Sequence, residues 1–425
     1  MASQLAGLVR GGRIAPESLL PPVRDLASLL DVSPGTVAAA YKTLRAQGLV
    51  STDRRRGTRV LPRVPTREYG EDRAPAGSLD LQVANPDPAL LPKLGRIFSR
   101  IDPESESYGG THLHDELIEL MRGRFLEDGI PAGHFVVTSG AIAAIHRALR
   151  VCLSPGDKVA VEDPGFNDHH AAARAHGLLT VPVPLDDEGL LPEHLEAALR
   201  GGARAVILAP RFQSPTGAAL SKRRALELRA VFSRHPDTLV LLDDYASALS
   251  PPGSYHHVLD RGHTRFLVVR SFNKVIAPDL RVGVVAADAE TADLMLREQW
   301  LTDGWVSAYL QRVAAAATSD RGTQLLIARA RDTYALRRTT LLTALRERGI
   351  TAHGATGLNV WVPVSDEAAV VRGLLEHGYC VRAGARYRLQ SPPAVRVTTA
   401  RLDAGDAHKI ADVLAALLRT GGRGP

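Results

Sequence analysis

A lysine that could bond covalently to a cofactor follows a short apolar segment. Residues 266–270 are expected to form a buried strand, and Lys274 lies just beyond its end. Partial burial disfavours the ammonium form of a lysine and gives a better amine nucleophile, as a Schiff base with an aldehyde requires. Ser271 and Arg281 flank Lys274 and could hold a phosphate group. Together these residues predict an attachment site for pyridoxal phosphate, although a lysine without such neighbours is more often a surface residue in a turn.

An acidic and an aromatic residue occupy the equivalent place after another apolar segment. Asp243 and Tyr245 follow residues 239–242, which read Leu-Val-Leu-Leu. A carboxylate at the end of a buried strand is costly unless it is paired. A protonated pyridine nitrogen would be such a partner, and the pair would make the ring an electron sink. Tyr245 could hydrogen-bond the phenolic oxygen of that ring; the alternative is a helix-capping aspartate beside a core tyrosine.

Three further groups of residues follow apolar segments in the same way: Ser139, Gly140 and Ala141; Phe166; and Ser214. The first group opens a predicted helix, where backbone N–H groups can bind a phosphate. The alternative is that residues 139–141 form an ordinary turn between a strand and a helix, because such a turn has a similar sequence. Phe166 could stack on a flat ring or could cap the core. Ser214 belongs to a turn-rich loop at residues 210–217.

All these residues fit one sheet whose strands end along a common edge. Short apolar segments alternate with helical patterns from residue 79 onward, and the expected strands are residues 135–138, 158–162, 180–183, 205–209, 238–242, 266–269 and 281–285. The alternation predicts an α/β domain with a mostly parallel sheet, in which ligands bind beyond the carboxyl ends of the strands. Residues 325–425 mix helical patterns with short strands and are expected to form a small C-terminal α+β subdomain.

The composition is that of a globular protein. The chain has 425 residues, enough for two or three domains, with 45% hydrophobic and 23% charged residues. No apolar segment approaches the roughly 20 residues that a membrane-spanning helix needs. Two cysteines, Cys152 and Cys380, argue against a disulfide framework or a metal cluster. We therefore expect a cytoplasmic protein with no metal and no membrane contact.

The first 63 residues carry the excess positive charge and predict a compact nucleic-acid-binding head. They hold ten Lys and Arg against four Asp and Glu, whereas the rest of the chain holds 42 of each kind. A basic head on a neutral body suggests a polyanion as partner. Apolar residues fall at i, i+3, i+4 and i+7 from Val23 and again from Val37, and Ser33 with Pro34 favours a helix start between them.

A hairpin follows these two helices. Residues 49–52 and 57–61 are its expected strands, and the turn holds three consecutive arginines at residues 54–56 that suit phosphates or the minor groove. Helices, turn and hairpin together predict a winged helix-turn-helix whose second helix turns Thr36, Lys42 and Arg45 outward. A small helical domain with a solvated basic hairpin is the alternative.

The head and the body are joined by a segment without hydrophobic periodicity. Prolines, glycines and charges of both signs make it a semi-flexible linker. We divide the chain into a DNA-binding domain at residues 1–63, a linker at 64–78, a large domain at 79–324 and a small subdomain at 325–425.

The head resembles the winged helix-turn-helix of GntR-type regulators. The matching stretches are residues 20–27, LPPVRDLA, and 32–49, VSPGTVAAAYKTLRAQGL. This resemblance implies double-stranded operator DNA as a partner, with phosphate contacts setting affinity and base contacts setting specificity. The side chains that it implies as DNA-facing are Ser33, Thr36, Lys42, Arg45, Arg54, Arg55, Arg56 and Arg59.

The body resembles fold-type-I aminotransferases. The motifs stand in the order of that family: Ser-Gly-Ala at 139–141, Asp-Pro-Gly-Phe at 163–166, Ser-Pro-Thr-Gly at 214–217, Asp-Asp-Tyr at 243–245, Ser-Phe-Asn-Lys at 271–274 and Pro-Asp-Leu-Arg at 278–281. A GntR-type head on such a body resembles the MocR subfamily of regulators. The resemblance implies a winged helix-turn-helix joined to a pyridoxal-phosphate-binding, aminotransferase-like domain, and a homodimer.

The resemblance also implies a role for each site residue. Lys274 would form the internal aldimine, Asp243 would pair with the ring nitrogen, Tyr245 would lie near the ring hydroxyl and Phe166 would stack on the ring. The phosphate would be bound by Ser139, Gly140, Ala141, Ser271 and Arg281, with Tyr108 reaching it from the other subunit. Arg396 would bind the carboxylate of a substrate or effector, with Arg386 and Arg388 as rivals for this role.

Two departures from the aminotransferase pattern bear on function. Ser214 stands where aminotransferases usually have Asn, and Leu113 stands where a glycine is usual. Both weaken the case for efficient transamination more than the case for cofactor binding. We therefore expect a transcriptional regulator that responds to pyridoxal phosphate, and an aminotransferase with an attached DNA-binding head is the alternative. A structural module that has lost the cofactor is disfavoured by the intact Lys274, Asp243 and Arg281.

The resemblance extends to the targets and effectors. It implies that the regulated genes are those of vitamin B6 salvage, such as the gene for pyridoxal kinase. An amino acid or a form of vitamin B6 is the effector that it suggests.

Overall fold

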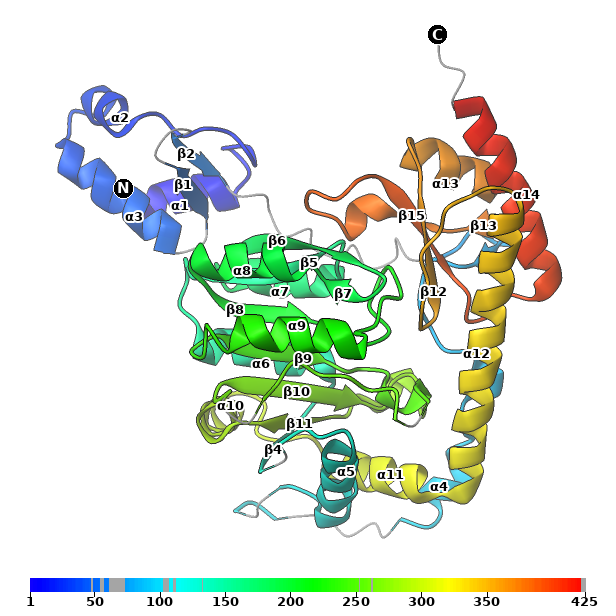
Figure 1. The fold of residues 1–425 in the computed structure, drawn as a ribbon. Helices are drawn as coiled ribbons and strands as arrows, with labels where there is room; N and C mark the ends of the chain where they lie inside the picture. The colour runs from blue at the N-terminus through cyan, green and yellow to red at the C-terminus, as the bar shows by residue number, and fades with distance from the viewer. Residues whose placement is uncertain are drawn as a thin grey trace.

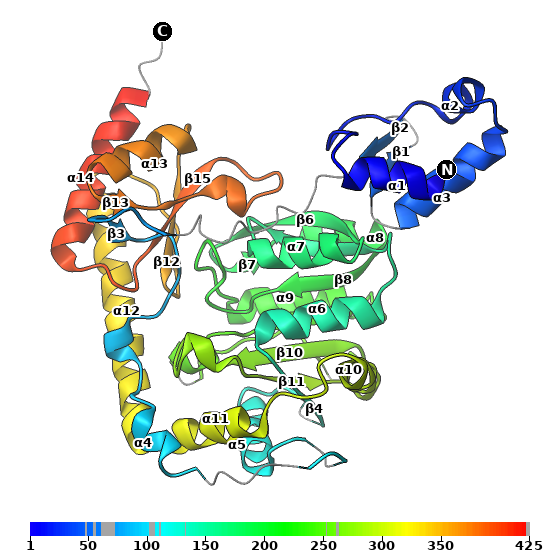
Figure 2. The same ribbon diagram turned by 180° about the vertical axis from the view of Figure 1, so that it is seen from behind.

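The computed structural model describes residues 1–46, 49–53, 57–60, 73–101, 107–109, 112–131, 133–251, 253–260 and 263–421. Arg54, Arg55 and Arg56 of the hairpin turn lie outside the described residues, and so do residues 64–72 of the linker. A small head and a larger α/β body are separate in space, and a second, smaller α/β unit lies beside the body (Figure 1, and from behind in Figure 2).

The head is a winged helix-turn-helix, as predicted. It contains α1 (Ala2–Arg10), α2 (Val23–Leu29), α3 (Pro34–Ala46) and an antiparallel hairpin of β1 (Val50–Asp53) and β2 (Gly57–Val60). Ser33 caps α3, because its Oγ accepts a hydrogen bond from the Thr36 N–H at 3.1 Å. Val37 and Leu44 are fully buried in the core of the head, which explains the apolar period of this helix.

The body is built on an eight-stranded sheet. Its order is β4 (His134–Thr138), β11 (Gly283–Ala287), β10 (Phe266–Ser271), β9 (Leu239–Asp243), β8 (Ala203–Leu208), β5 (Lys158–Asp163), β6 (Leu179–Asp186) and β7 (Gly189–Leu190). The strands are parallel except that β11 runs against both of its neighbours and β7 runs against β6. The strand expected at residues 281–285 begins only at Gly283. Arg281 has a left-handed backbone with a φ of 51° and follows the 3₁₀ turn η3 (Pro278–Leu280).

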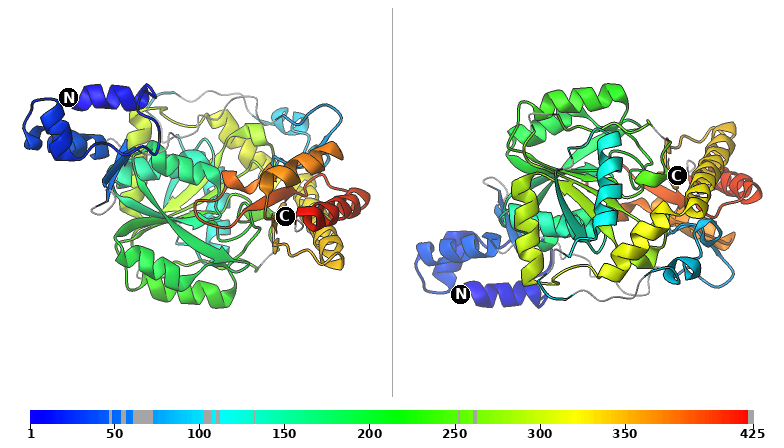
Figure 3. Two further views of the ribbon diagram at one scale, coloured as in Figure 1. Left: turned by 90° about the horizontal axis from the view of Figure 1, so that it is seen from above. Right: turned by 90° about the horizontal axis from the view of Figure 1, so that it is seen from below.

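Helices cover both faces of this sheet, as the views along it show (Figure 3). One face is covered by α6 (Ala141–Cys152), α7 (Asn167–Ala175) and α10 (Ala289–Leu301), and the other by α5 (Asp115–Glu127), α8 (Pro192–Arg200), α9 (Lys222–Phe232) and α11 (Ala308–Ser319). Strand β9 contributes to both cores: Leu239 and Leu241 pack on the first face, and Val240 and Leu242 on the second. Burial on both faces explains the continuous apolar runs by which these strands were predicted.

The small domain packs around a second sheet. It comprises α12 (Arg321–Glu347), β12 (Asn359–Pro363), α13 (Glu367–Glu376), β13 (Tyr379–Cys380), β14 (Arg382–Ala383), η4 (Gly384–Arg386), β15 (Ala394–Thr398) and α14 (Ala404–Gly421). Strands β12, β15 and β14 form an antiparallel sheet. The division of the chain at residues 63, 78 and 324 stays a prediction.

One short strand from the beginning of the body joins the small domain. Strand β3 (Leu79–Asp80) pairs in parallel with β13, and Leu81 is fully buried in the core of the small domain. The chain then passes through η1 (Pro88–Leu90) and α4 (Gly95–Phe98) to the large domain, which also holds η2 (Ser247–Leu249). Residues that directly follow the linker therefore pack with residues about 300 positions later. Among the described residues, no helix is both long and apolar enough to cross a bilayer.

Candidate cofactor site

Most of the predicted site residues line one cavity where the strand ends of the large domain meet the small domain. Its volume is about 290 Å³. The predicted residues that line it are Ala141, Phe166, Ser214, Asp243, Tyr245, Lys274, Arg281 and Arg396. They come from the ends of β5, β9 and β10, from the loop after β8, from the start of α6 and from β15. Side chains more than 250 positions apart in the sequence are thus brought together, as expected for the carboxyl edge of a parallel sheet.

Asp243 is the last residue of β9 and is only 3% exposed. One of its oxygens, Oδ2, lies 2.9 Å from Nε2 of His169. The other, Oδ1, is buried and has no hydrogen-bond partner among the described residues. An unsatisfied buried carboxylate oxygen is costly. Asp243 therefore lacks one N–H donor, and the residue lines the cavity.

His169 also lines the cavity, and the sequence analysis missed it. It is 3% exposed and lies on α7, one helical turn after Phe166. The two rings meet edge to face, with centroids 5.3 Å apart. The i, i+3 spacing of Phe166 and His169 was the available signal, because residues so spaced share one face of a helix.

Lys274 extends into the cavity from the turn after β10. Its Nζ donates a hydrogen bond to the Ala84 carbonyl and lies 5.9 Å from the ring centre of Tyr245. Burial and, to a smaller extent, the nearby Arg396 cation lower the pKa of the Lys274 amine to about 8, although Asp243 opposes the shift. A larger fraction of this amine is therefore neutral and nucleophilic than in an exposed lysine.

Arg281 and the start of α6 form a cationic pocket at another part of the cavity. Arg281 Nη2 donates to the Ser139 carbonyl at 2.9 Å. Gly140 caps α6 with a φ of 108°, a backbone conformation that favours glycine, and a Cβ there would lie 3.0 Å from Arg281 Nη2. The first N–H groups of α6 have no partner within the helix. A guanidinium beside unpaired N–H groups is an arrangement that binds a phosphate.

Arg396 is buried in the cavity wall, with an exposed fraction of 4%. It donates to the Gln82 carbonyl, contacts Ser214 Oγ at 3.3 Å and lies over the Tyr387 ring at 4.6 Å. Its Nε has no partner, and no carboxylate in the described part of the chain forms a salt bridge with it. Of its two rivals, Arg386 lines the same cavity, whereas Arg388 is bonded to Glu367 at 2.8 Å.

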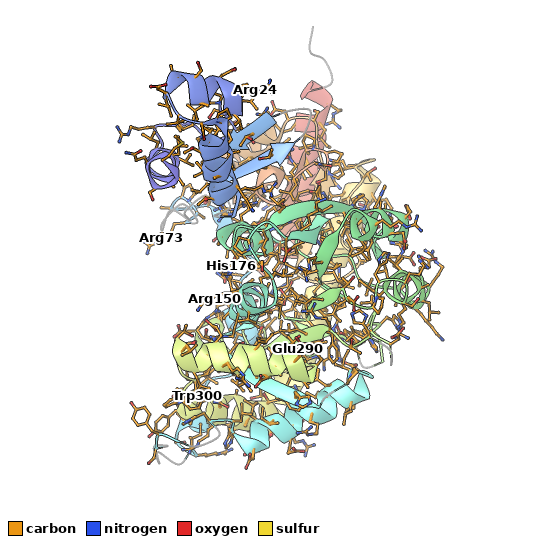
Figure 4. All side chains as sticks on the ribbon, turned by 90° about the vertical axis from the view of Figure 1, so that its left-hand side faces the viewer. Arg24, Arg73, Arg150, His176, Glu290 and Trp300 are labelled. Atoms are coloured by element: carbon orange, nitrogen blue, oxygen red, sulfur yellow. The ribbon has the colours of Figure 1, made fainter. Side chains whose placement is uncertain are left out.

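The predicted DNA-facing residues that the structure describes are on the surface of the head. Ser33, Thr36, Lys42 and Arg45 are exposed on or next to α3, and Arg59 is exposed on β2. Ser33 and Thr36 hydroxyls are 2.8 Å apart, and Arg59 donates to the Glu17 carbonyl at 2.7 Å. Arg24 on α2 lies at the top of the same head (Figure 4).

The body matches the family model "Aminotransferase class I and II" over residues 80–414. The chain belongs to the aminotransferase class I and II family. Residues 2–60 match the model of bacterial regulatory proteins of the gntR family. This combination makes the protein a DNA-binding transcriptional regulator of the MocR type.

Similar proteins agree with this assignment. The MocR-type chain is 39% identical to the vitamin B6 salvage pathway transcriptional repressor PtsJ of Salmonella typhimurium, over 96% of this chain and 95% of PtsJ. It is 27% identical to the pyridoxine biosynthesis transcriptional regulator PdxR of Corynebacterium glutamicum, over 80% of this chain and 76% of PdxR. The fold is similar to that of the kynurenine aminotransferase of Pyrococcus horikoshii, with a TM-score of 0.74 and 24% identity over 81% of this chain and 91% of that enzyme.

The cavity of this MocR-type regulator fits the cofactor of its family, pyridoxal phosphate. The unpartnered Asp243 Oδ1 suits a protonated pyridine nitrogen, and the pocket of Arg281 and α6 suits a phosphate. Lys274 would supply the amine, and Phe166 lines the same cavity. Ser139 and Gly140 adjoin the cavity through Arg281. Ser271 is buried next to it, and its hydroxyl contacts the Tyr245 carbonyl at 3.1 Å and Asn273 Oδ1 at 2.8 Å.

Tyr245 lines the cavity, and its expected place near the ring hydroxyl stays a prediction. Its hydroxyl donates to the Phe212 carbonyl at 2.7 Å. Burial raises the pKa of this phenol, so the side chain stays neutral. Because the only hydroxyl proton is used, Tyr245 can accept a hydrogen bond from a ring hydroxyl but cannot donate one without leaving Phe212. Ser214 in turn contacts Arg396.

Two acidic residues at the end of β5 were not recognised from the sequence. Glu162 lines the cavity and is held by the Ala209 N–H at 3.0 Å and the Gln213 amide at 3.1 Å. Burial raises its pKa to about 7. Asp163 is 4% exposed and accepts hydrogen bonds from the backbone N–H groups of residues 389, 390 and 391, at 2.7 to 3.0 Å. This contact, which we call the Asp163 clamp, fastens a small-domain loop to the large domain.

Tyr108 does not line the cavity of its own chain. It is 91% exposed and packs edge to face on Trp305, with centroids 5.5 Å apart. Its expected role on the phosphate of another subunit stays a prediction.

Proposed function

We propose that this regulator senses pyridoxal phosphate and controls genes of vitamin B6 salvage, such as the gene for pyridoxal kinase, in the cytoplasm. The observation that carries the proposal is Asp243 Oδ1, a buried oxygen that lacks a donor in a cavity also lined by Lys274 and Arg281. The names of the relatives PtsJ and PdxR, both regulators connected with vitamin B6, support the choice of target genes.

Different residues would bind different parts of the cofactor. Arg281 and the N–H groups at the start of α6 hold the phosphate, and Asp243, oriented by His169, holds the ring nitrogen. Phe166 limits the position of the ring, and Lys274 offers an amine whose pKa is lowered to about 8. When bound, pyridoxal phosphate supplies an aldehyde that an amine can attack and a ring that withdraws electrons.

A single segment supports the coupling between the cavity and the head. Residues 79–85 directly follow the linker, and Leu79 and Leu81 bond to Gly378 and Cys380 of the small domain at 2.8 and 2.9 Å. The same segment contacts two cationic groups of the cavity: the Gln82 carbonyl accepts from Arg396, and the Ala84 carbonyl accepts from Lys274. A lysine amine bonded to a cofactor can no longer donate freely to Ala84. Cofactor binding therefore changes the contacts of the segment that leads to the head.

This change need not create a new conformation. A ligand that binds one arrangement of body and head more tightly raises the population of that arrangement, and the DNA affinity follows. Coupling free energies of this kind are typically about 1–3 kcal/mol, which corresponds to roughly 5- to 150-fold in affinity. We therefore expect a change of this size in the dissociation constant for operator DNA.

A homodimer is part of the proposal. Trp300 is 52% exposed on α10 and lies at the lower edge of the side shown in Figure 4, and its ring is 5.7 Å from that of Trp305. Tyr108, which is highly exposed, packs on the Trp305 ring, and Leu301, the residue after Trp300 in the sequence, is also highly exposed. An exposed apolar surface of this kind is typical of a protein–protein interface. A dimer would present two heads to repeated half-sites in the DNA.

A second candidate function is transamination by the same cavity. The buried Arg396, whose Nε lacks a partner, favours it, because a substrate carboxylate would satisfy this group. Ser214 disfavours it, since its hydroxyl contacts Arg396 at 3.3 Å in the place where aminotransferases usually have Asn. An amino-acid or vitamin B6 effector that binds without turnover would use the same arginine.

The decisive experiment is a titration of pyridoxal phosphate into full-length wild type and Lys274→Ala. The visible absorbance of the lysine-bound cofactor and the affinity for the DNA upstream of the gene are measured on the same samples. Wild type should show both the absorbance and a shifted DNA affinity, whereas Lys274→Ala should bind DNA with no cofactor response. Lys222→Ala, which changes an exposed lysine on α9, is the matched control and should behave as wild type.

Two outcomes would contradict the proposal. If wild type shows no such absorbance, the cofactor does not bind through Lys274. If the DNA affinity is the same with and without the cofactor, cofactor binding does not regulate DNA binding. Rapid conversion of amino acids to keto acids by the loaded protein would instead support the second candidate function.

A further inference from the structure

A second cavity, with a volume of about 250 Å³, lies between the large and the small domain and shares no lining residue with the cofactor cavity. One wall is the long helix α12, which runs from the large domain into the small domain (Figure 1). Arg331, Tyr334 and Arg338 of α12 line the cavity, and their i, i+3 and i+7 spacing places them on one face of the helix. Other walls come from the end of η2 in the large domain and from residues 355–357 of the small domain. A ligand in this cavity would therefore contact both domains.

Arg338 is a partly buried cation that lines this cavity. Its Nη1 donates to the Gly357 carbonyl at 2.9 Å, and its buried Nε has no hydrogen-bond partner among the described residues. Burial lowers the pKa of its guanidinium, and no carboxylate in the described part of the chain opposes that shift. A charge that is removed from water without a counter-charge is costly. A bound anion would offset this cost.

The other two arginines of this cavity have acidic partners. Arg211 is bonded to Asp244 through Nε at 2.6 Å and through Nη2 at 2.8 Å. Arg331 Nε lies 3.0 Å from Oδ1 of the exposed Asp332. No acidic residue lines the cavity in the part of the chain that the structure describes. Among the described residues, the cavity therefore has one positive charge without an ion pair, that of Arg338, and it suits a ligand with one negative charge.

The chemistry of the walls favours a carboxylate with an apolar body. The N–H groups of a guanidinium form a planar fork that can pair with both oxygens of an acid group. Gly357 occupies Nη1 of Arg338, and the fork of Nε and Nη2 has no partner among the described residues. Phe212, Leu249 and Pro251 add apolar surface to the walls. Such a combination of apolar walls and one polar anchor is typical of a site for a small organic ligand.

We propose that this cavity binds a small monocarboxylate, whose acid group pairs with Arg338 and whose apolar body packs against Phe212 and Leu249. The ligand is additional to pyridoxal phosphate, and its site does not depend on the sensor function. Tyr334 packs in the core of the large domain, whereas Leu341 of the same helix packs in the core of the small domain. A ligand held here therefore strengthens the contact between the two domains.

The test compares benzoate with benzamide, which has the shape of benzoate without its charge. Both are titrated into the full-length protein by calorimetry, with and without pyridoxal phosphate. Benzoate should occupy one site per chain that benzamide occupies at least about tenfold more weakly, because benzamide cannot make the charge-assisted contacts to the guanidinium. Inorganic phosphate at the same concentration, which lacks an apolar body, should not displace benzoate. The absence of such a site, or displacement of benzoate by phosphate, would overturn the proposal.

Two substitutions locate the site. Arg338→Gln removes the charge, and Ala335→Leu fills the cavity from the same helix without removing it, so both should abolish the benzoate site. Arg346→Gln, which changes an exposed arginine of α12, is the matched control and should retain it. Thermal unfolding checks each variant; if Arg338→Gln does not fold, Ala335→Leu still decides the question. A benzoate site that survives in either folded variant would overturn the proposal.

Arg396→Gln distinguishes this site from the cofactor cavity, which Arg396 lines. The benzoate site should persist in Arg396→Gln, and its loss there would place benzoate in the cofactor cavity and overturn the proposal. The absorbance of the bound cofactor, recorded on the same samples, tests the sensor function separately. A benzoate site in a protein without this absorbance would support the proposal and contradict the sensor, whereas a normal cofactor response without a benzoate site would contradict the proposal alone.

Discussion

His169 Nε2 lies 2.9 Å from Asp243 Oδ2, and both side chains are buried beneath the cofactor cavity. An ionised carboxylate can only accept hydrogen bonds, so the histidine must carry its proton on Nε2 when Asp243 is charged. The contact fixes one carboxylate oxygen and leaves the other, Oδ1, without a donor among the described residues. Asp243 is therefore oriented before any ligand binds. Substitution of this residue tests whether it binds the ring nitrogen of the cofactor.

Asp243→Asn should weaken the binding of pyridoxal phosphate by about 30- to 150-fold. The substitution removes a charge-assisted hydrogen bond worth about 2–3 kcal/mol. Equilibrium titration followed by the visible absorbance of the bound cofactor measures the change. His169→Asn should have a smaller effect, because it removes only the orientation of Asp243. An unchanged dissociation constant for Asp243→Asn would mean that the ring nitrogen is held elsewhere.

The rate of cofactor attachment should rise with pH and level off above pH 8. Burial and the Arg396 cation lower the Lys274 pKa to about 8, and only the neutral amine attacks an aldehyde. Stopped-flow absorbance on cofactor-free protein from pH 6.5 to 9.5 measures this midpoint, on the order of pH 8. Arg396→Gln removes one cause of the shift and should move the midpoint to higher pH. A midpoint at the ordinary lysine value of 10.5 would show that Lys274 is not perturbed.

The same pKa shift makes a prediction for stability. Between about 8 and the ordinary value of 10.5, the unfolded state keeps a proton on Lys274 that the folded state has lost. The free energy of unfolding should therefore rise with pH in this window, and Lys274 should add no slope below it. Denaturant unfolding of wild type and Lys274→Met at several pH values isolates this slope as the difference between the two. A difference that is constant from pH 8 to 10 would contradict it.

The positions of the site residues at the strand ends could be predicted from the sequence, but the hydrogen-bond partners of these residues could not. Asp243 ends β9 and Lys274 follows β10, as expected, because apolar segments identify buried strands and a parallel sheet gathers their carboxyl ends. His169 escaped notice because its partner lies 74 positions away. The Ala84 carbonyl that contacts Lys274 is 190 positions away, and a backbone oxygen carries no residue-type signal.

The short strand β3 was beyond prediction for a related reason. It has two residues, too few for a period, and its partner β13 is another two-residue strand about 300 positions later. Such pairing is decided by the packing of the small domain around Leu81 and not by local preference. The winged head, by contrast, has clear helical periods and a cap at Ser33, and the sequence predicted α2, α3 and the hairpin.

Loss of the Asp163 clamp should free the loop that it holds. In Asp163→Ala the backbone N–H groups of residues 389, 390 and 391 lose their acceptor, so their hydrogen exchange should accelerate by at least about tenfold, as expected for the loss of about 1.4 kcal/mol. Exchange measured by mass spectrometry on the whole chain detects this. Asp187→Ala, which removes the exposed pair between Asp187 and His353, is the control and should leave this loop unchanged. Unaltered exchange at residues 389–391 would contradict the clamp.

Lys42→Ala should weaken DNA binding and make it less dependent on salt. Lys42 is exposed on α3, so the folded state is unaffected, and each lost phosphate contact lowers the slope of log K against log salt by about 0.9. Fluorescence anisotropy with an operator fragment at several salt concentrations measures the slope. Lys222→Ala on the body should leave the slope unchanged, and an unchanged slope for Lys42→Ala would place this lysine away from the phosphates.

The Asp163 clamp has a consequence for how the ligand preference of this protein can change by mutation. The carboxylate holds main-chain N–H groups, which every residue except proline provides, and the neighbouring loop residues Arg386 and Tyr387 line the cavity. The loop is therefore attached through main-chain atoms, whereas its contribution to ligand preference comes from side chains. Mutation can therefore change the side chains at residues 386–390 while the loop stays bound to Asp163. New ligand preferences can arise in this way without loss of the contact between the two domains.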